Sequence, residues 1–308
     1  MEALFVPLAL ISGGLLAVQA GANAQLSKAV GSPFAATTLQ LSVGTGLLAL
    51  VALLTGTLAA LVALPQAEWW HLVGGAASAI YVVSTIVLFP RLGAVVSVGL
   101  FIAGQMLASL AIDSFGLLGV TRTGLQAGAA IGTAVVLLGA AMIVFGQTGG
   151  TDNLKADKLG WIVLALFAGA VLPAQGAVNA LLRQDLGGAS FAVGAVSFFV
   201  ATLAMAAVLL VTLAWLKAPR PNIGGMQAMP WWGWLGGFAG ATYVTTVFTA
   251  IPVIGAAAAV GFTVAGQQIA SVFVDRYGWF RLPQRPVSVL RLAGVVLLLC
   301  GVALIKLI

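Results

Sequence analysis

The segment GQMLASLAID at residues 104–113 recurs as GQQIASVFVD at residues 266–275. Each copy begins with glycine and glutamine, has a serine in the middle and ends in aspartate. The flanking sequence aligns without a gap, so that residues 69–146 match residues 231–308. Identical residues at matching positions include Trp69 and Trp231, Tyr81 and Tyr243, and Pro90 and Pro252. The chain is therefore a tandem duplication.

The composition places this duplication in a membrane. Of the 308 residues, 61% are hydrophobic and 6% are charged, whereas a soluble domain has roughly 25% charged residues. So few polar side chains cannot cover a surface that faces water. The apolar runs are unbroken rather than alternating with polar residues, which favours helices over a β-barrel. We therefore expect an all-α membrane protein.

Proline, glycine and charged residues divide the chain into segments long enough to cross a bilayer, which takes about 20 apolar residues. The ten predicted spans are 4–27, 34–63, 69–89, 93–112, 124–146, 160–182, 190–216, 231–251, 255–274 and 287–307. They form two five-span repeats, residues 1–147 and 160–308, joined by a linker at 148–159. Because five is odd, the second repeat enters the membrane from the opposite side, so the repeats are inverted.

The basic residues predict the orientation, because loops rich in Lys and Arg stay in the cytoplasm. One side of the predicted topology holds three of the 13 basic residues, namely Arg122, Arg183 and Lys306. The other side holds the remainder, including both lysines of the linker. Both termini are accordingly predicted outside and the linker inside. The net charge of +6 is thus a topology signal, and nucleic acid is not an expected partner.

Two amide pairs occupy equivalent places in the first and sixth spans. Gln19 and Asn23 are four residues apart and share one helix face, and Gln175 and Asn179 repeat the pattern. Polar side chains inside a membrane are costly unless they are satisfied. The pairs could line a central cavity or join neighbouring helices by hydrogen bonds. The sequence leaves both interpretations open.

The fourth and ninth spans carry the recurring stripe of glutamine, serine and aspartate. Its members, four residues apart, are Gln105, Ser109 and Asp113 in one repeat and Gln267, Ser271 and Asp275 in the other. For the glutamines we favour a cavity. The aspartates sit at span ends, so we favour an interfacial position over a role in coupling. Tyr81 and Tyr243 lie in mid-span, where a hydroxyl needs a partner and a ring could accept a cation.

The composition also excludes most catalytic chemistry. With one cysteine and one histidine, Cys300 and His71, the chain cannot build a thiolate metal site or a disulfide framework. The acidic residues form no close pair, and no phosphate-binding loop motif occurs. We expect no catalytic residue, no metal and no cofactor, so an enzyme is not predicted.

The quoted motifs resemble the YdcZ-type branch of the drug/metabolite transporter superfamily. The resemblance covers both halves of the chain, and the chain as a whole resembles the fused ten-span form of this branch. It implies a multi-pass protein of the bacterial inner membrane, with an inverted-repeat fold like the small multidrug-resistance and EamA-type exporters. Those small exporters carry a glutamate in the middle of the first span, where this chain has Gln19 and Asn23. This departure argues against exchange at a central carboxylate.

The function predicted on these grounds is secondary active export of a small organic metabolite or drug-like solute by alternating access. The predicted midplane cavity would be lined by Gln19, Asn23, Tyr81, Gln105, Gln175, Asn179, Tyr243 and Gln267. Proton coupling, if it occurs, would use Asp113 and Asp275, the acids present in both repeats. The expected partners are the solute and membrane lipid, and a monomer is expected with a dimer left open. The alternative is a non-transporting accessory or lipid-handling membrane protein.

Overall fold

A computed structural model of the chain describes residues 2–92, 94–148, 158–284 and 286–307, and none of these lies in a β-strand. Each predicted span contains an α-helix. The helices of the first half are α1 (Glu2–Val30), α2 (Pro33–Leu54), α3 (Ala76–Leu92), α4 (Ala94–Phe115) and α5 (Ala127–Thr148). Those of the second half are α6 (Leu159–Asp185), α7 (Ser190–Ala214), α8 (Leu235–Ile254), α9 (Ala256–Tyr277) and α10 (Val289–Leu307).

By length and composition, nine helices in the described part of the chain can cross a membrane. The tenth, α10, is shorter over its described apolar stretch, Val289–Ile305. The structure therefore confirms an all-α membrane protein with ten long helices.

Three predicted spans differ from the helices that form. Span 34–63 is too long, because α2 ends at Leu54 and Gly56 adopts a left-handed conformation with φ of 72°. The chain continues as the 3₁₀ helix η1 (Thr57–Gln66). The third and eighth spans begin as the 3₁₀ helices η2 (Trp69–Gly75) and η7 (Trp231–Trp234) before α3 and α8. Of the predicted linker, residues 149–157 lie outside the described part of the chain.

The two halves share even their irregular turns. After α4 comes the short helix η3 (Leu117–Gly119), and after α9 comes η8 (Trp279–Arg281). The middle residue of each is left-handed, with φ of 51° at Leu118 and 58° at Phe280. L-residues other than glycine rarely adopt this conformation. Its presence at matching positions indicates that the halves have one fold.

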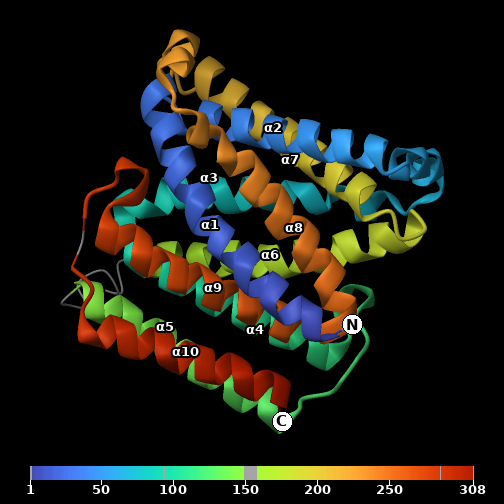
Figure 1. Ribbon diagram of the computed structural model, residues 1–308, viewed down its shortest axis with the longest axis vertical. Helices are drawn as coiled ribbons and strands as arrows, with labels where there is room; N and C mark the ends of the chain where they lie inside the picture. The colour runs from blue at the N-terminus through green and yellow to red at the C-terminus, as the bar shows by residue number, and fades with distance from the viewer. Residues whose placement is uncertain (1, 93, 149–157, 285, 308) are drawn as a thin grey trace.

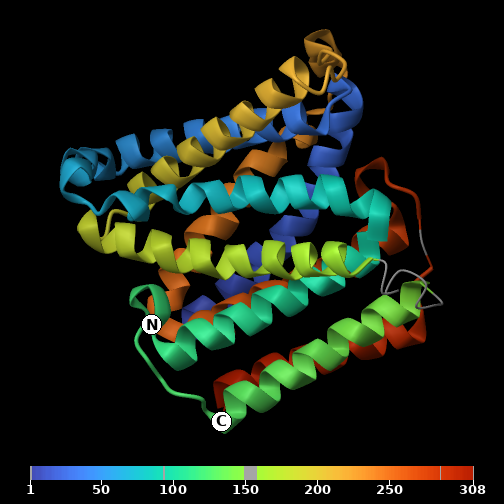
Figure 2. The ribbon, with the colours of Figure 1, turned by 180° about the vertical axis from the view of Figure 1, so that it is seen from behind.

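The repeats are inverted relative to each other. The two termini lie at the same end of the helices, whereas α5 ends and α6 begins at the opposite end (Figure 1). The pair α5 and α10 packs on α4 and α9, and α2 packs on α7 far from that pair (Figure 1). From behind, α6 lies between α3 and α4 (Figure 2). This arrangement is the ten-helix inverted-repeat fold.

Glycines bring helices of opposite repeats into backbone contact. A Cβ atom on Gly104 of α4 would lie 2.0 Å from the carbonyl oxygen of Leu166 in α6. The matching glycine of α9, Gly266, faces the carbonyl oxygen of Leu10 in α1, at 1.9 Å from the same hypothetical atom. Small residues allow membrane helices to approach closely in this way. The crossings of α4 with α6 and of α1 with α9 therefore require glycine.

Substitution of Gly104 or Gly266 by Ala should destabilise the protein by about 3 kcal/mol, the upper range for overpacking. The added methyl group must displace a backbone, which cannot rotate away as a side chain can. The control is Gly46→Ala in α2, where a Cβ would meet nothing within 4 Å. Thermal unfolding of the purified variants in detergent is the measurement. Equal melting temperatures for all three variants would contradict the proposed crossings.

Candidate functional site

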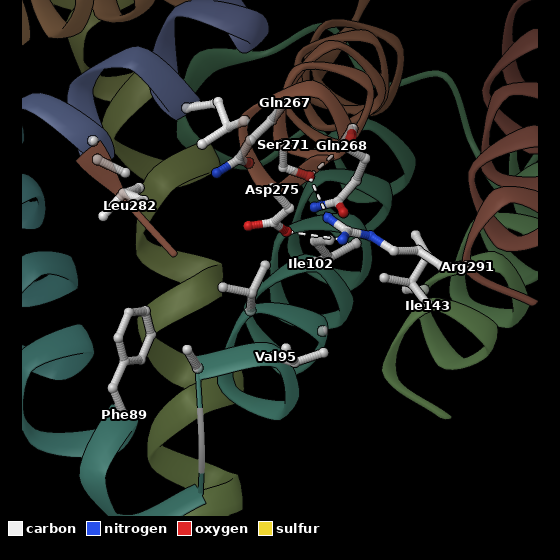
Figure 3. A pocket seen from close by; sticks show the side chains of 18 residues that line it. Phe89, Val95, Ile102, Ile143, Gln267, Gln268, Ser271, Asp275, Leu282 and Arg291 are labelled. Atoms are coloured by element: carbon white, nitrogen blue, oxygen red, sulfur yellow. Dashed lines mark hydrogen bonds and ion pairs between the residues drawn. The ribbon is translucent and has the colours of Figure 1, made fainter. Parts of the chain in front are cut away.

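A cavity of about 260 Å³ lies between the two repeats. Six helices contribute to its wall: α1, α3, α4, α5, α9 and α10. It occupies the end of the bundle at which α3 and α9 finish and α4 and α10 begin. We refer to it as the open cavity, and Figure 3 shows the side chains that line it.

One side of the open cavity is polar. It is formed by Gln267, Gln268, Ser271 and Asp275 of α9 and by Arg291 of α10 (Figure 3). The Arg291 guanidinium pairs with the Asp275 carboxylate at 2.8 Å and donates a hydrogen bond to the Ser271 hydroxyl at 3.1 Å. Arg291 has only 3% of its side chain exposed, whereas Asp275 has 23%. The carboxylate is therefore the charged group more accessible from the cavity.

The other side of the open cavity is apolar. Its larger side chains are Phe89 of α3, Val95, Val98 and Ile102 of α4, and Ile143 of α5. Small residues of α1, including Ala17 and Ala20, complete the wall. A mainly apolar cavity with a few convergent polar groups is typical of small-molecule sites, although most of those are larger, roughly 300–1,000 Å³.

The equivalent region of the other half is closed. Ile251, the counterpart of Phe89, is 1% exposed, whereas Phe89 is 37% exposed. A Cβ atom on Gly176, the counterpart of Ala20, would lie 2.6 Å from the Ile251 side chain. Val260 is buried, although its counterpart Val98 lines the open cavity. A small cavity of about 80 Å³ lies nearby, beside Ala177 and Pro252.

Asp113 joins the two repeats at the closed end. Its two carboxylate oxygens accept hydrogen bonds from the backbone N–H groups of Ala256 at 2.8 Å and Ala257 at 2.7 Å. These are the first residues of α9, so a negative charge meets the positive end of a helix dipole. Gly255, with φ of 83°, makes the sharp break between α8 and α9 that presents these groups. The counterpart Gly93 lies outside the described residues.

The amide pair of α6 joins helices. The Gln175 side chain exchanges hydrogen bonds with the Ser78 hydroxyl of α3, at 2.9 and 3.1 Å. Asn179 donates to the Ser197 hydroxyl of α7 at 3.0 Å. Both amides are buried and absent from the residues that line the open cavity. In this structure they have the helix-joining role, and contact with a solute stays a prediction.

The remaining predicted residues are divided among several places. Gln267 alone of the eight candidate binding residues lines the open cavity. Asn23 donates to the Thr37 hydroxyl of α2 at 3.2 Å, and Gln19 lies against Gly240 of α8. Gln105 is buried in α4, Tyr81 packs on Phe101, and Tyr243 is buried in α8. Whether these residues contact solute in another state stays a prediction.

Sequence reasoning did not identify two pairings. Arg291 could be paired with acidic groups or with lipid phosphates, and nothing in the sequence selects Asp275. An arginine within an apolar span must, however, be paired, and Asp275 is the acid at the adjoining end of α9. The second pairing is between the His71 Nδ1 atom of η2 and a carboxylate oxygen of Asp185, at the end of α6. The sequence gives no signal for this contact, because His71 is not repeated in the second half, where Gly233 stands at the matching position.

The inverted repeats and apolar helices form a multi-pass membrane protein with a cavity between its two halves. The family described as "Putative inner membrane exporter, YdcZ" matches residues 4–142 and 160–304, one segment in each repeat. The chain belongs to this family. At this level it is a multi-pass transporter of the inner membrane, in a family of exporters rather than of enzymes.

Comparison with solved structures supports the same fold. A crystal structure of a protein with 17% sequence identity superposes with a TM-score of 0.69. The match covers 98% of this chain and 95% of the other chain. At this identity the likeness establishes the fold alone. A comparison with curated proteins finds no match.

Replacing Gln175 by Leu should lower the free energy of unfolding by about 1–3 kcal/mol, because the Ser78 and Ser197 hydroxyls lose buried partners. Gln267→Leu is the control, because the same substitution is made at a glutamine that lines the open cavity, and its loss should change stability less. Thermal unfolding of both variants in detergent compares the two. A smaller effect for Gln175→Leu than for Gln267→Leu would reverse the assignment of the amides.

Proposed function

We propose that the chain is a secondary active transporter that exports a small organic solute by alternating access. The observation that carries the proposal is the difference between the two halves. Residues that line the open cavity in one half have buried counterparts in the other, as with Phe89 and Ile251 or Val98 and Val260. Inverted repeats that take unequal conformations can exchange them, which opens the opposite side.

The charge distribution predicts which side of the membrane the open cavity faces. The open cavity lies at the end that the basic residues predict to be cytoplasmic. In that orientation both termini are outside, and solute loads from the cytoplasm. Release follows when the open cavity closes and its counterpart opens. This direction agrees with a family of inner membrane exporters.

The cavity favours a neutral or weakly polar solute. Asp275 and Arg291 neutralise each other, so the site carries no net charge to balance an ion. The apolar side would pack on the body of the solute, and the Gln267 amide would hydrogen-bond to its polar group. The volume favours a metabolite smaller than most drugs. Asp275 is the candidate carboxylate for proton coupling, because it faces the cavity.

The first test is a thermal-shift screen of the purified protein against neutral, cationic and anionic metabolites. A compound that binds only the folded state stabilises it, by about 2.7 kcal/mol at 100 times its Kd. Neutral or weakly polar compounds should raise the melting temperature. Gln267→Leu should abolish this shift, whereas Gln227→Leu, an exposed glutamine outside the cavity, should retain it. Stabilisation by phospholipids alone would favour the lipid-handling alternative.

Transport itself is tested by the paired glutamines. The double variant Gln105→Leu/Gln267→Leu should lose flux of the identified compound in proteoliposomes by at least tenfold, since both access states then lack the amide. Size-exclusion chromatography checks that the protein remains folded. Full flux in the folded double variant would refute the role of the glutamines.

A further inference from the structure

The two recurring aspartates occupy different environments in this structure. Asp113 is buried, and its carboxylate accepts hydrogen bonds from two backbone N–H groups at the start of α9. Asp275 is its counterpart, and the start of α4 is the counterpart of the start of α9. Asp275 does not have the equivalent partners: it pairs with Arg291 of α10. One sequence position thus makes an inter-repeat contact in one half and an intra-repeat contact in the other.

The start of α4 remains across the cavity from Asp275. Ala94 and Val95, the first residues of α4, line the open cavity together with Asp275. Figure 3 shows Val95 and Asp275 in this cavity. Ala94 is exposed, whereas its counterpart Ala256 is completely buried beneath Asp113. The cavity therefore separates the Asp275 carboxylate from the start of α4, which is the counterpart of the helix terminus that Asp113 binds.

We propose that Asp113 and Asp275 are alternating latches that close opposite sides of the transport cavity. Each closes its side by binding the first backbone N–H groups of a helix in the other repeat, α9 for Asp113 and α4 for Asp275. In the present state the Asp113 latch is closed. Arg291, which also donates a hydrogen bond to Ser271, holds Asp275 on its own repeat, which leaves that side open.

Exchange of these carboxylate contacts explains how one conformational change closes one side of the cavity and opens the other. Closing the open cavity moves Asp275 from Arg291 to the start of α4, and opening the other side separates Asp113 from α9. A carboxylate at a helix N-terminus is stabilised by the helix dipole and by charge-assisted hydrogen bonds. The same interaction is therefore lost on one side and regained on the other. The inference rests on the proposed transport function and assigns residues to its conformational step.

The test measures the accessibility of one residue on each side. In a Cys300→Ala background, Val98→Cys reports on the open cavity and Val260→Cys on the closed counterpart. In the native chain a membrane-impermeant maleimide should label position 98 quickly and position 260 slowly. Replacing Asp113 by Asn should increase labelling at position 260 by about tenfold, which corresponds to 1.4 kcal/mol in the equilibrium, and should decrease labelling at position 98.

Two further variants complete the test. One should favour the present state, and the other should leave the labelling rates unchanged. Asp275→Asn removes the latch of the other state, so position 98 should stay reactive and position 260 protected. Ser114→Ala is the matched control, because Ser114 is a buried neighbour of Asp113 whose hydroxyl has no hydrogen-bond partner in the described structure. It should leave both rates unchanged. A merely structural role for Asp113 would increase labelling at both positions, and this result would overturn the proposal.

The outcomes separate the latch from the proposed function. If Asp113→Asn leaves both labelling rates unchanged while metabolite binding persists, the latch is wrong and the transporter proposal stands. If the rates change in opposite directions but no metabolite binds, the latch stands and the solute-carrier proposal loses its support. Arg291→Lys provides an independent variant: weaker restraint of Asp275 should slow labelling at position 98, and faster labelling there would count against the role of Arg291.

Discussion

The backbone contacts at two helix crossings hold the repeats together. Each crossing joins one helix of the first repeat to one of the second, α1 with α9 and α4 with α6, and glycines remove the side chains between them. The glutamines of the recurring stripe follow these glycines directly, at Gln105 and Gln267. The polar positions of both repeats are thereby placed beside the crossings. Helices that touch at one point can diverge on either side of it, and the cavity opens where they diverge.

Membrane burial explains the remaining polar contacts. Within an apolar bundle, a polar side chain is stable when another group satisfies it. Gln175 and Asn179 find the hydroxyls of Ser78 and Ser197, and Asp113 finds two backbone donors. Gln19 instead faces Gly240, which occupies the place of Ser78 in the other repeat and has no hydroxyl. The two amide pairs, alike in sequence, thus have unequal surroundings.

The fold could be predicted from the sequence because each relevant signal is local or periodic. Apolar runs specify helices, and the recurrence of GQ with a distant aspartate specifies two halves. The end of α2 was harder to place, since the apolar run continues past Gly56 into a 3₁₀ helix. The site could be predicted only in part. Gln267 and Asp275 lie on the open cavity, but their counterparts Gln105 and Asp113 do not. The recurring segment is nearly the same in both halves, so this segment alone could not predict which of its copies lines the cavity.

Arg291 makes the two ends of the molecule chemically unequal. Its counterpart in the first repeat is Ala129, so the carboxylate at one end has an intramolecular counter-ion on its own fifth helix and the other does not. Two identical five-helix chains assembled as an antiparallel, two-fold symmetric dimer would carry this arginine at both ends or at neither. Fusion into one polypeptide removes that symmetry requirement. The covalent link therefore permits the two ends of one molecule to differ in charge, which symmetry forbids in a homodimer of half-length subunits.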